Sequence, residues 1–226
     1  MNDIKKNLTN KIRRDFDRLA FYDIEQWNHN NHYHSFLLEH LPIRCKTILD
    51  IGCGVGEFSR LLANRTDKVT AIDLSPNSIK IAKQRSKQFN NIDYLVADVS
   101  QWEFPPEHFE AIVSIATVHH LSLAKLLPKI KASLKPGGVL IILDLLDNRG
   151  IEGLLSDCIA IPFNWWFIAK NKPREIPLEA KEAMREHQKS DRYLNLSQVK
   201  NIYNSFLTTP KIRKHLFWRY SVVWQK

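Results

Sequence analysis

From Lys46 onward, short runs rich in Val, Ile and Leu alternate with amphipathic segments, and this alternation most constrains the fold. Such runs are typical of parallel strands that are covered by helices on both faces. Strands are expected at 46–52, 68–73, 92–99, 109–117 and 139–146, and helices at 57–65, 75–89 and 122–134. "KPGG" at 135–138 is expected to form a turn before the fifth strand. The pattern predicts an α/β fold with a mostly parallel sheet.

The chain outside this alternation is expected to complete the same domain. Residues 18–42 resemble one or two helices that end at Pro42, and 149–195 is first apolar and aromatic, then polar. Residues 196–206 return to helical spacing, and 211–226 contains two β-runs joined by a tight bend. We therefore expect one domain with four parts: cap helices (1–42), a ligand-binding core (43–148), a lid insertion (149–195), and a last helix with a hairpin (196–226).

Composition excludes several classes of protein. The 226 residues suffice for one sizeable core, and no apolar window is long enough for a signal peptide or a membrane-spanning helix. The three cysteines are too far apart for a disulfide framework or a Cys-x-x-Cys metal pair. The net charge of +9 comes from dispersed basic residues. These features favour a cytoplasmic protein with a solvated basic surface, and a nucleic-acid partner is not expected.

A glycine turn lies between the first strand and the first helix of the alternation, in "ILDIGCGVGEFSRLL". Gly52, Gly54 and Gly56 let a ligand approach the backbone, and the following helix offers free N–H groups. The dinucleotide fingerprint G-x-G-x-x-G would need a third glycine at the position of Glu57. A glutamate there would repel a pyrophosphate, so the turn favours a ligand with a positive centre.

Acidic residues follow the expected strand ends. Asp50 precedes the glycine turn, Asp73 ends the second strand and Asp98 ends the third. Open α/β sheets bind ligands at the carboxyl ends of their strands. Asp73 follows the glycines by about the ~20 residues of a nucleoside site, where an acid accepts both ribose hydroxyls. With Glu57, these acids are expected to surround one crevice.

These motifs together resemble the class I S-adenosylmethionine-dependent methyltransferases. The matching segments, in order, are "ILDIGCGVGEF", "AIDLSP", "YLVADV", "IVSIATVHHL" and "LKPGGVLIILD", and they cover roughly Leu41 to Leu146. The resemblance implies a Rossmann-like, doubly wound, seven-stranded sheet with a C-terminal antiparallel hairpin and helices on both faces. It also implies S-adenosylmethionine as the cofactor and S-adenosylhomocysteine as the product.

The resemblance assigns cofactor roles to individual positions. Asp50 would support the turn, and Gly52, Cys53 and Gly54 would approach the amino-acid half of the cofactor. Asp73 would hold the ribose, Leu74 would contact the adenine, and Asp98 would accept from the adenine amino group with Val99 nearby. Ile115 and Ala116 would line the methionine side.

Methyl transfer from a sulfonium needs an in-line nucleophile, and a general base only if the acceptor must lose a proton. His119 is the candidate base, although one of the pair His119 and His120 can equally cap or pack. His29, His32 and His34 form a second histidine cluster. Histidine number alone would allow a metal, but no Asp or Cys stands at suitable spacing, so no metal site is predicted.

The acceptor is expected to meet aromatic and amphipathic side chains. Candidate substrate residues are Trp27, Tyr33, His34, His120, Trp165 and Trp166, the last two in an aromatic lid with Phe163 and Phe167. This composition favours a small, partly apolar acceptor, bound by a monomer or a homodimer. The alternatives are an RNA or protein methyltransferase, suggested by the charge, and a non-catalytic cofactor-binding protein. A membrane-surface role for "IPFNWWFIAK", with a lipid-like acceptor, also stays open.

Overall fold

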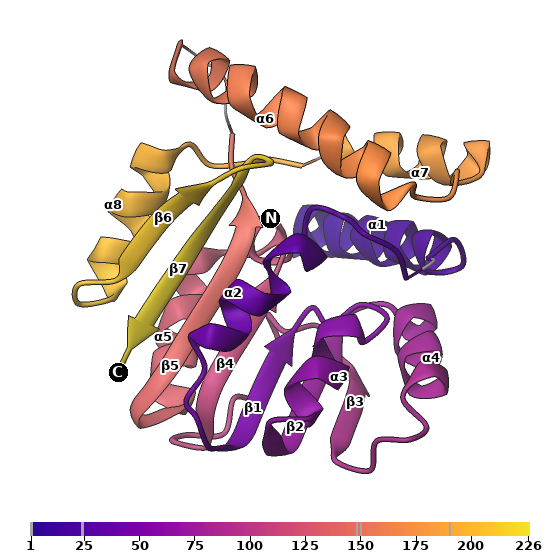
Figure 1. Ribbon diagram of the computed structural model, residues 1–226. Coiled ribbons are helices and arrows are strands. Elements are labelled where there is room, and N and C mark those ends of the chain that lie inside the picture. Colours follow the sequence, from indigo (N-terminus) through magenta and orange to yellow (C-terminus); the bar gives the residue numbers. More distant parts are fainter. Residues whose placement is uncertain (1, 24, 148, 150, 190) are drawn as a thin grey trace.

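The computed structural model describes residues 2–23, 25–147, 149, 151–189 and 191–226, with the backbone alone for 2–6, 151–157 and 159. In the described residues one sheet has seven strands in the order β3-β2-β1-β4-β5-β7-β6 (Figure 1). The strands are β1 (Cys45–Ile51), β2 (Thr66–Asp73), β3 (Ile92–Val96), β4 (Phe109–Ile115), β5 (Leu134–Leu145), β6 (Lys211–His215) and β7 (Arg219–Gln225). The first five run parallel, whereas β7 is antiparallel to β5 and to β6. The predicted sheet class and terminal hairpin are confirmed.

One predicted turn is wrong. "KPGG" at 135–138 lies inside β5, which pairs with β4 through Leu134 opposite Phe109 and then through Val139 opposite Ala111. The register shift between these pairs is a bulge, and Gly137 adopts a φ of +77° within it. The bulge absorbs the Pro-Gly-Gly sequence without ending the strand.

The helices alternate with the strands as expected in the central part of the chain. They are α1 (Asn2–Ala20), α2 (His34–Glu39), α3 (Glu57–Ala63), α4 (Pro76–Arg85), α5 (Leu123–Ser133), α6 (Ile151–Asn171), α7 (Leu178–Gln188) and α8 (Leu196–Phe206), with 3₁₀ turns η1 (Asn31–Tyr33) and η2 (Val118–His120). Ser75 caps α4 by accepting a hydrogen bond from the Ser78 N–H, and Pro76 occupies the first helical position. Residues 21–23 and 25–30 are a loop, so the helical region expected over 18–42 is interrupted there.

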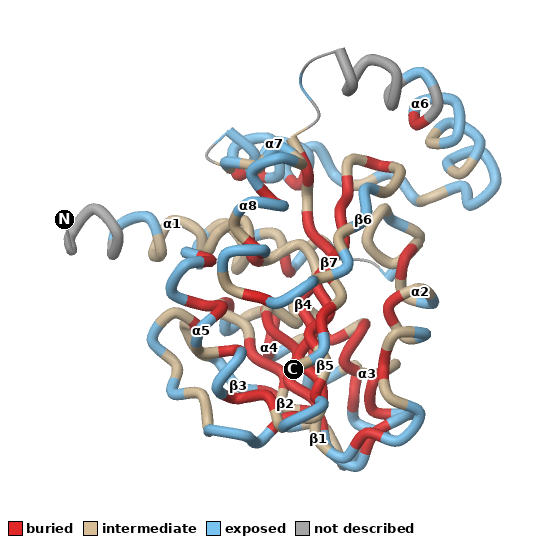
Figure 2. The backbone as a smooth tube through the Cα atoms, turned by 90° about the vertical axis from the view of Figure 1, so that its left-hand side faces the viewer, coloured by how far each residue is buried: buried red, intermediate tan, exposed pale blue. Residues whose placement is uncertain are grey.

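Two apolar clusters cover the two faces of the sheet. One packs α5 and α8 against it through Leu127 and Tyr203, and the other packs α2, α3 and α4 through Leu37, Leu62 and Ile79. Figure 2 shows the buried backbone concentrated in the strands between these layers. Because both faces are covered, ligands can reach the sheet only at its edges and strand ends.

Helices α1 and α7 lie beyond the carboxyl ends of the parallel strands (Figure 1). Asp17 of α1 accepts hydrogen bonds from the Ser75 hydroxyl at 2.6 Å and from the Asn77 N–H at 3.1 Å. These bonds fix α1 to the start of α4, next to the end of β2. The N-terminal helix therefore closes one side of the edge where the glycine turn lies.

Candidate active site

A cavity of about 550 Å³ lies at this carboxyl edge. Its wall combines α1, loop residues 22, 23, 26 and 28–30, the glycine turn, the ends of β2, β3 and β4, α7 and the start of β7. Eight of the ten predicted cofactor residues line it: Gly52, Gly54, Asp73, Leu74, Asp98, Val99, Ile115 and Ala116. Side chains from strand ends that are distant in sequence therefore meet in one space.

The glycine turn forms the floor of this cavity. A Cβ on Gly52 would collide with Thr117, lying 2.7 Å from the Thr117 Cβ, so the loop after β4 packs directly against the turn. A Cβ on Gly54, at φ +53°, would meet nothing within 4 Å. The turn is therefore closed to added atoms at Gly52 but open at Gly54, where a ligand can approach the backbone.

Asp73 supports the turn and faces the cavity at once. One of its carboxylate oxygens accepts from the Gly54 N–H and the other from the Ser75 N–H, both at 2.8 Å. Burial raises the pKa of Asp73, and the two backbone N–H bonds oppose that rise. Asp98 accepts from the Ser100 N–H at 2.8 Å and also lines the cavity. Two carboxyl groups that can accept hydrogen bonds therefore lie at the ends of the successive strands β2 and β3.

The other two predicted cofactor residues lie behind the wall. Asp50 is buried and accepts a hydrogen bond from the Ser59 hydroxyl at 2.6 Å, and desolvation raises its pKa to about 7. Cys53 is half-buried and donates its backbone N–H to the Ile72 carbonyl. Glu57 does not line the cavity either, because its carboxylate accepts from Asn31 at 3.1 Å. Asp50 and Cys53 hold the shape of the turn and do not face the cavity.

Among the predicted substrate residues, His120 lines the cavity, and burial lowers its pKa to about 3. Tyr33 and His34 instead contact other elements: the Tyr33 hydroxyl donates to the Leu216 carbonyl, and the His34 ring lies against Phe58 of α3. Trp27 stacks on Phe167 of α6, with ring centroids 5.4 Å apart. These three residues occupy the space between elements, so contact with an acceptor in the cavity is not supported by their positions.

The aromatic lid predicted from α6 does not roof the cavity. Trp165 and Trp166 are 72% and 53% exposed and are not among the residues that line the cavity. Phe167 is the α6 aromatic that turns inward, because it stacks on Trp27. At about 100° per residue, Trp165 lies nearly opposite Phe167 on α6, whereas the Trp166 ring packs edge-on against Phe167 with centroids 4.8 Å apart.

The candidate base His119 also lies outside the cavity wall. Its Nδ1 is 2.6 Å from the carboxylate of Asp144, and both side chains are almost fully buried. The role of His119 as a general base stays a prediction, and the location of His119 outside the cavity wall does not support it. His120, the next residue, is the histidine that reaches the cavity.

Several cavity residues could not be found from sequence. Arg219 is buried at the start of β7, where its guanidinium donates to the Asn30 side chain and the Phe217 carbonyl. Ile12 and Phe16 of α1 and Met184 of α7 form much of the apolar wall. The amphipathic pattern of α1 was the available signal, but it does not indicate which surface the apolar face covers.

Comparisons with known proteins agree with this architecture. Residues 48–138 match a family described as a methyltransferase domain. An uncharacterized methyltransferase of Mycobacterium bovis is 34% identical over 133 residues, which are 58% of this chain and 66% of that protein. A malonyl-[acyl-carrier protein] O-methyltransferase of Paenibacillus is 41% identical over 112 residues, 46% of this chain and 41% of that protein. A demethylmenaquinone methyltransferase of Tropheryma whipplei is 30% identical over 148 residues, 62% of each chain.

The matched region thus spans 66%, 41% and 62% of these three relatives, less than two thirds of each. Solved structures share the fold over more of the chain. The N-methyltransferase NodS from Bradyrhizobium japonicum, in complex with S-adenosylhomocysteine, aligns with a TM-score of 0.65 at 18% identity, over 96% of this chain and 98% of that one. A phosphoethanolamine N-methyltransferase of Haemonchus contortus aligns with a TM-score of 0.64 at 22% identity, over 89% of this chain and 46% of that one. By its motifs, its strand order and these matches, residues 48–138 form a methyltransferase domain of the class I S-adenosylmethionine-dependent type, and the rest of the chain shares the fold of such enzymes.

Proposed function

We propose that this chain binds S-adenosylmethionine in the carboxyl-edge cavity and transfers its methyl group to a small, partly apolar acceptor. The observation that carries the proposal is the convergence of Gly54, Asp73 and Asp98 on one cavity of about 550 Å³. The open space above Gly54 fits a ligand that approaches the backbone, as the cofactor's amino-acid half would. Asp73 and Asp98 are suitably placed to accept hydrogen bonds from ribose hydroxyls and from an adenine amino group.

When bound, the cofactor supplies an electrophilic methyl group on a sulfonium. The chain contributes position and exclusion of water: Ile115 and Ala116 would contact the methionine side, and α1 and α7 close the cavity from outside. His120 and Arg219 lie in the same wall and would face an acceptor. Because burial keeps His120 neutral, its imidazole can accept or donate one hydrogen bond to that acceptor.

The names of the relatives support a small-molecule acceptor. They methylate malonyl-[acyl-carrier protein], demethylmenaquinone and, in a cyanobacterial relative, 2-methyl-6-phytyl-1,4-hydroquinone. The cavity wall in this chain is rich in apolar side chains from α1 and α7, which suits acceptors with an apolar part.

One observation favours a second form of this function, in which the acceptor is reached at a lipid surface. Among the side chains of α6 that the structure describes, five large apolar ones are exposed: Ile161, Phe163, Trp165, Trp166 and Ile168. Lys170 lies over the Trp166 ring at 5.0 Å, and further basic residues follow the helix. Tryptophans beside basic residues are typical of helices that lie in a membrane interface. Among the described helices, none is long and apolar enough to cross a membrane.

Calorimetry with S-adenosylmethionine tests the core of the proposal. Asp73→Ala should weaken binding strongly, whereas the matched control Asp93→Ala changes only an exposed carboxylate that pairs with Lys68 on the sheet surface. Absence of binding by the unaltered chain would refute the proposal. The acceptor is then sought by S-adenosylhomocysteine release across thiols, phenols, amines, carboxylates and RNA, and release stimulated by RNA alone would reject the small-molecule acceptor.

A further inference from the structure

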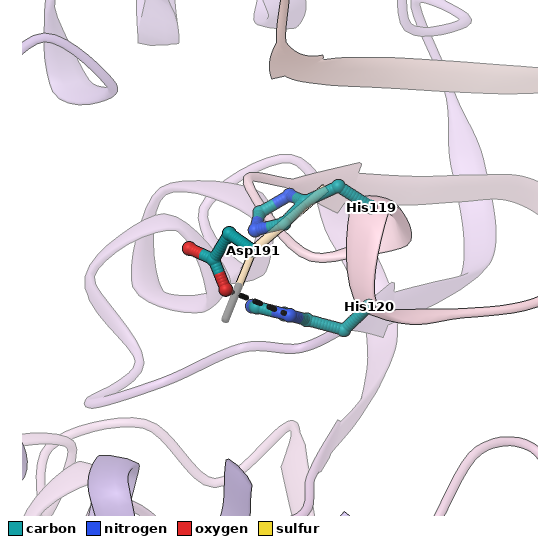
Figure 3. Close-up of side chains that lie close together, drawn as sticks. All are labelled: His119, His120 and Asp191. Atoms are coloured by element: carbon teal, nitrogen blue, oxygen red, sulfur yellow. Dashed lines mark ion pairs between the residues drawn. The ribbon is translucent and has the colours of Figure 1, made fainter. Parts of the chain in front are cut away.

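Three side chains that could ligate a metal converge beside the cavity. His119 and His120 project from η2, and Asp191 comes from the segment after α7 (Figure 3). One donor atom of each lies within 4.8 Å of the others. Consecutive histidines and a distant aspartate meet here because α7 packs against α1 and brings His187 and the segment that follows α7 beside η2.

The three side chains are oriented by further partners. His119 Nδ1 is bonded to Asp144, which leaves the other ring nitrogen facing Asp191 in Figure 3. One oxygen of Asp191 accepts from the Tyr193 hydroxyl at 2.8 Å, and the other oxygen faces His120. Metal-ligating histidines almost always donate their second ring N–H to a carboxylate or carbonyl, and ligating carboxylates are themselves hydrogen-bonded. Asp144 and Tyr193 supply this pattern.

One buried polar atom of the cluster and one beside it lack hydrogen-bond partners. His120 Nε2 is buried without a hydrogen-bond partner, and so is the second oxygen of Asp144. His120 Nδ1 lies 3.7 Å from Asp191, beyond hydrogen-bond distance. An unpartnered buried polar atom in a native protein often marks a missing water or ion.

These separations suit donors that share one ion. Zinc–nitrogen and zinc–oxygen bonds of ~2.0–2.1 Å allow two donors of one ion to be up to ~4 Å apart. The 3.7 Å gap between His120 and Asp191 lies inside that limit. The widest separation in the cluster exceeds it by less than ~1 Å, which side-chain rotation can close.

We propose that His119, His120 and Asp191 form a binding site for a divalent transition-metal ion such as Zn²⁺. Two imidazoles and one carboxylate suit zinc, cobalt, iron or manganese, and the oxygen-poor set disfavours Ca²⁺ and Mg²⁺. Three protein ligands leave a coordination position for water or for another molecule. Because His120 also lines the cavity, the ion would lie at the wall that an acceptor contacts.

The competing explanation is a metal-free cluster in which Asp191 pairs with a protonated histidine. His187 approaches the same Asp191 oxygen at 3.8 Å and contacts Asp15 through its other ring nitrogen at 3.2 Å. This arrangement would hold α7 against α1 without any ion. The two explanations differ in one measurable property, the affinity for a metal.

Titration of the chelator-treated full chain with Co²⁺ distinguishes them. We expect one equivalent to bind with the visible absorption bands of a low-coordinate Co²⁺ site, and Zn²⁺ to displace it. Asp191→Asn and His120→Gln should each weaken binding at least tenfold, and Asp144→Asn by ~10–100-fold through the orientation of His119. The matched control His108→Gln removes an exposed histidine at the opposite end of β4 and should bind as the unaltered chain does.

Absence of a one-equivalent Co²⁺ signal in the unaltered chain would overturn the proposal, and so would unchanged affinity in both ligand variants. Circular dichroism and thermal melting confirm that each variant is folded. If Asp191→Asn does not fold, His120→Gln decides the question, because His120 Nε2 has no hydrogen bond to lose. The readout contains no S-adenosylmethionine, so its failure leaves the proposed methyl transfer standing, and the converse also holds.

Discussion

Replacing Gly54 by alanine should separate ligand binding from folding. Gly54 has a φ of +53°, a left-handed conformation that costs an L-residue roughly 1–2 kcal/mol. Alanine also lowers the conformational entropy of the unfolded chain, and this effect stabilises the folded state by about 0.4–1 kcal/mol. No atom lies within 4 Å of the added methyl group, so no clash adds to the net cost of ~1 kcal/mol. For a chain of this size that corresponds to a melting temperature lower by ~2–4 °C.

The same methyl group would stand in the space through which the cofactor reaches the turn. A steric cost of ~1.4 kcal/mol in the complex would weaken cofactor binding tenfold, and we expect the affinity of Gly54→Ala to fall by at least that factor. Gly137→Ala is the matched control: φ is +77°, nothing lies within 4 Å, and the residue sits in the β5 bulge away from the cavity. Both variants should lose similar stability, and only Gly54→Ala should lose affinity.

Calorimetric titration with S-adenosylhomocysteine, together with thermal melting, measures both quantities on each variant. Affinity in Gly54→Ala within about twofold of the unaltered chain would refute the reasoning. Equal loss of affinity in both variants would refute it too, because the effect would then follow from strain and not from the occupied space.

Three further perturbations test other parts of the structure. Gly52→Ala should destabilise the chain by about 1–3 kcal/mol more than strain alone, because its methyl group collides with Thr117, and adding Thr117→Ala should recover part of that loss in urea unfolding. Burial lowers the pKa of His34 to about 4, so its contribution to stability is complete above about pH 6.5 and is lost as the pH falls toward 4. The free energy of unfolding of His34→Gln should therefore decline less steeply over that window than that of the unaltered chain, by at most ~1.4 kcal/mol per pH unit. Replacing Trp165 and Trp166 by serine should leave the melting temperature nearly unchanged, since both are exposed, but should reduce cosedimentation with anionic vesicles; unchanged cosedimentation would reject the lipid-surface form of the function.

Local pattern was enough to predict the central fold. The five predicted parallel strands all exist, with ends that differ by a few residues, because apolar runs of that length can only be buried between two helical layers. The hairpin at 211–226 was also predicted. The bulge at 135–138 was missed because Pro-Gly-Gly has the same local signature in a turn and in an irregular strand.

The residues of the candidate site also fall into those that local sequence predicted and those that it did not. Gly54, Asp73 and Asp98 were found because strand ends in a parallel sheet meet at one edge, whatever the helices do. Trp165 and Trp166 were assigned to a lid, but periodicity within a helix does not say which face meets the cavity. Cap helices were expected over 1–42, but the residues of α1 that line the wall were not identified, because contacts between distant elements leave no local signature.

The sequence by itself determined the sheet, the glycine turn and the carboxylates beside it, because each depends on residues close together in the chain. Only the tertiary structure decided that His119 turns to Asp144, that Arg219 is buried in the wall, and that Asp191 reaches the histidines of η2. No spacing rule relates Asp191 to His120. They meet because α7 packs against α1 beyond the strand ends, and that packing depends on the shape and burial of the whole edge.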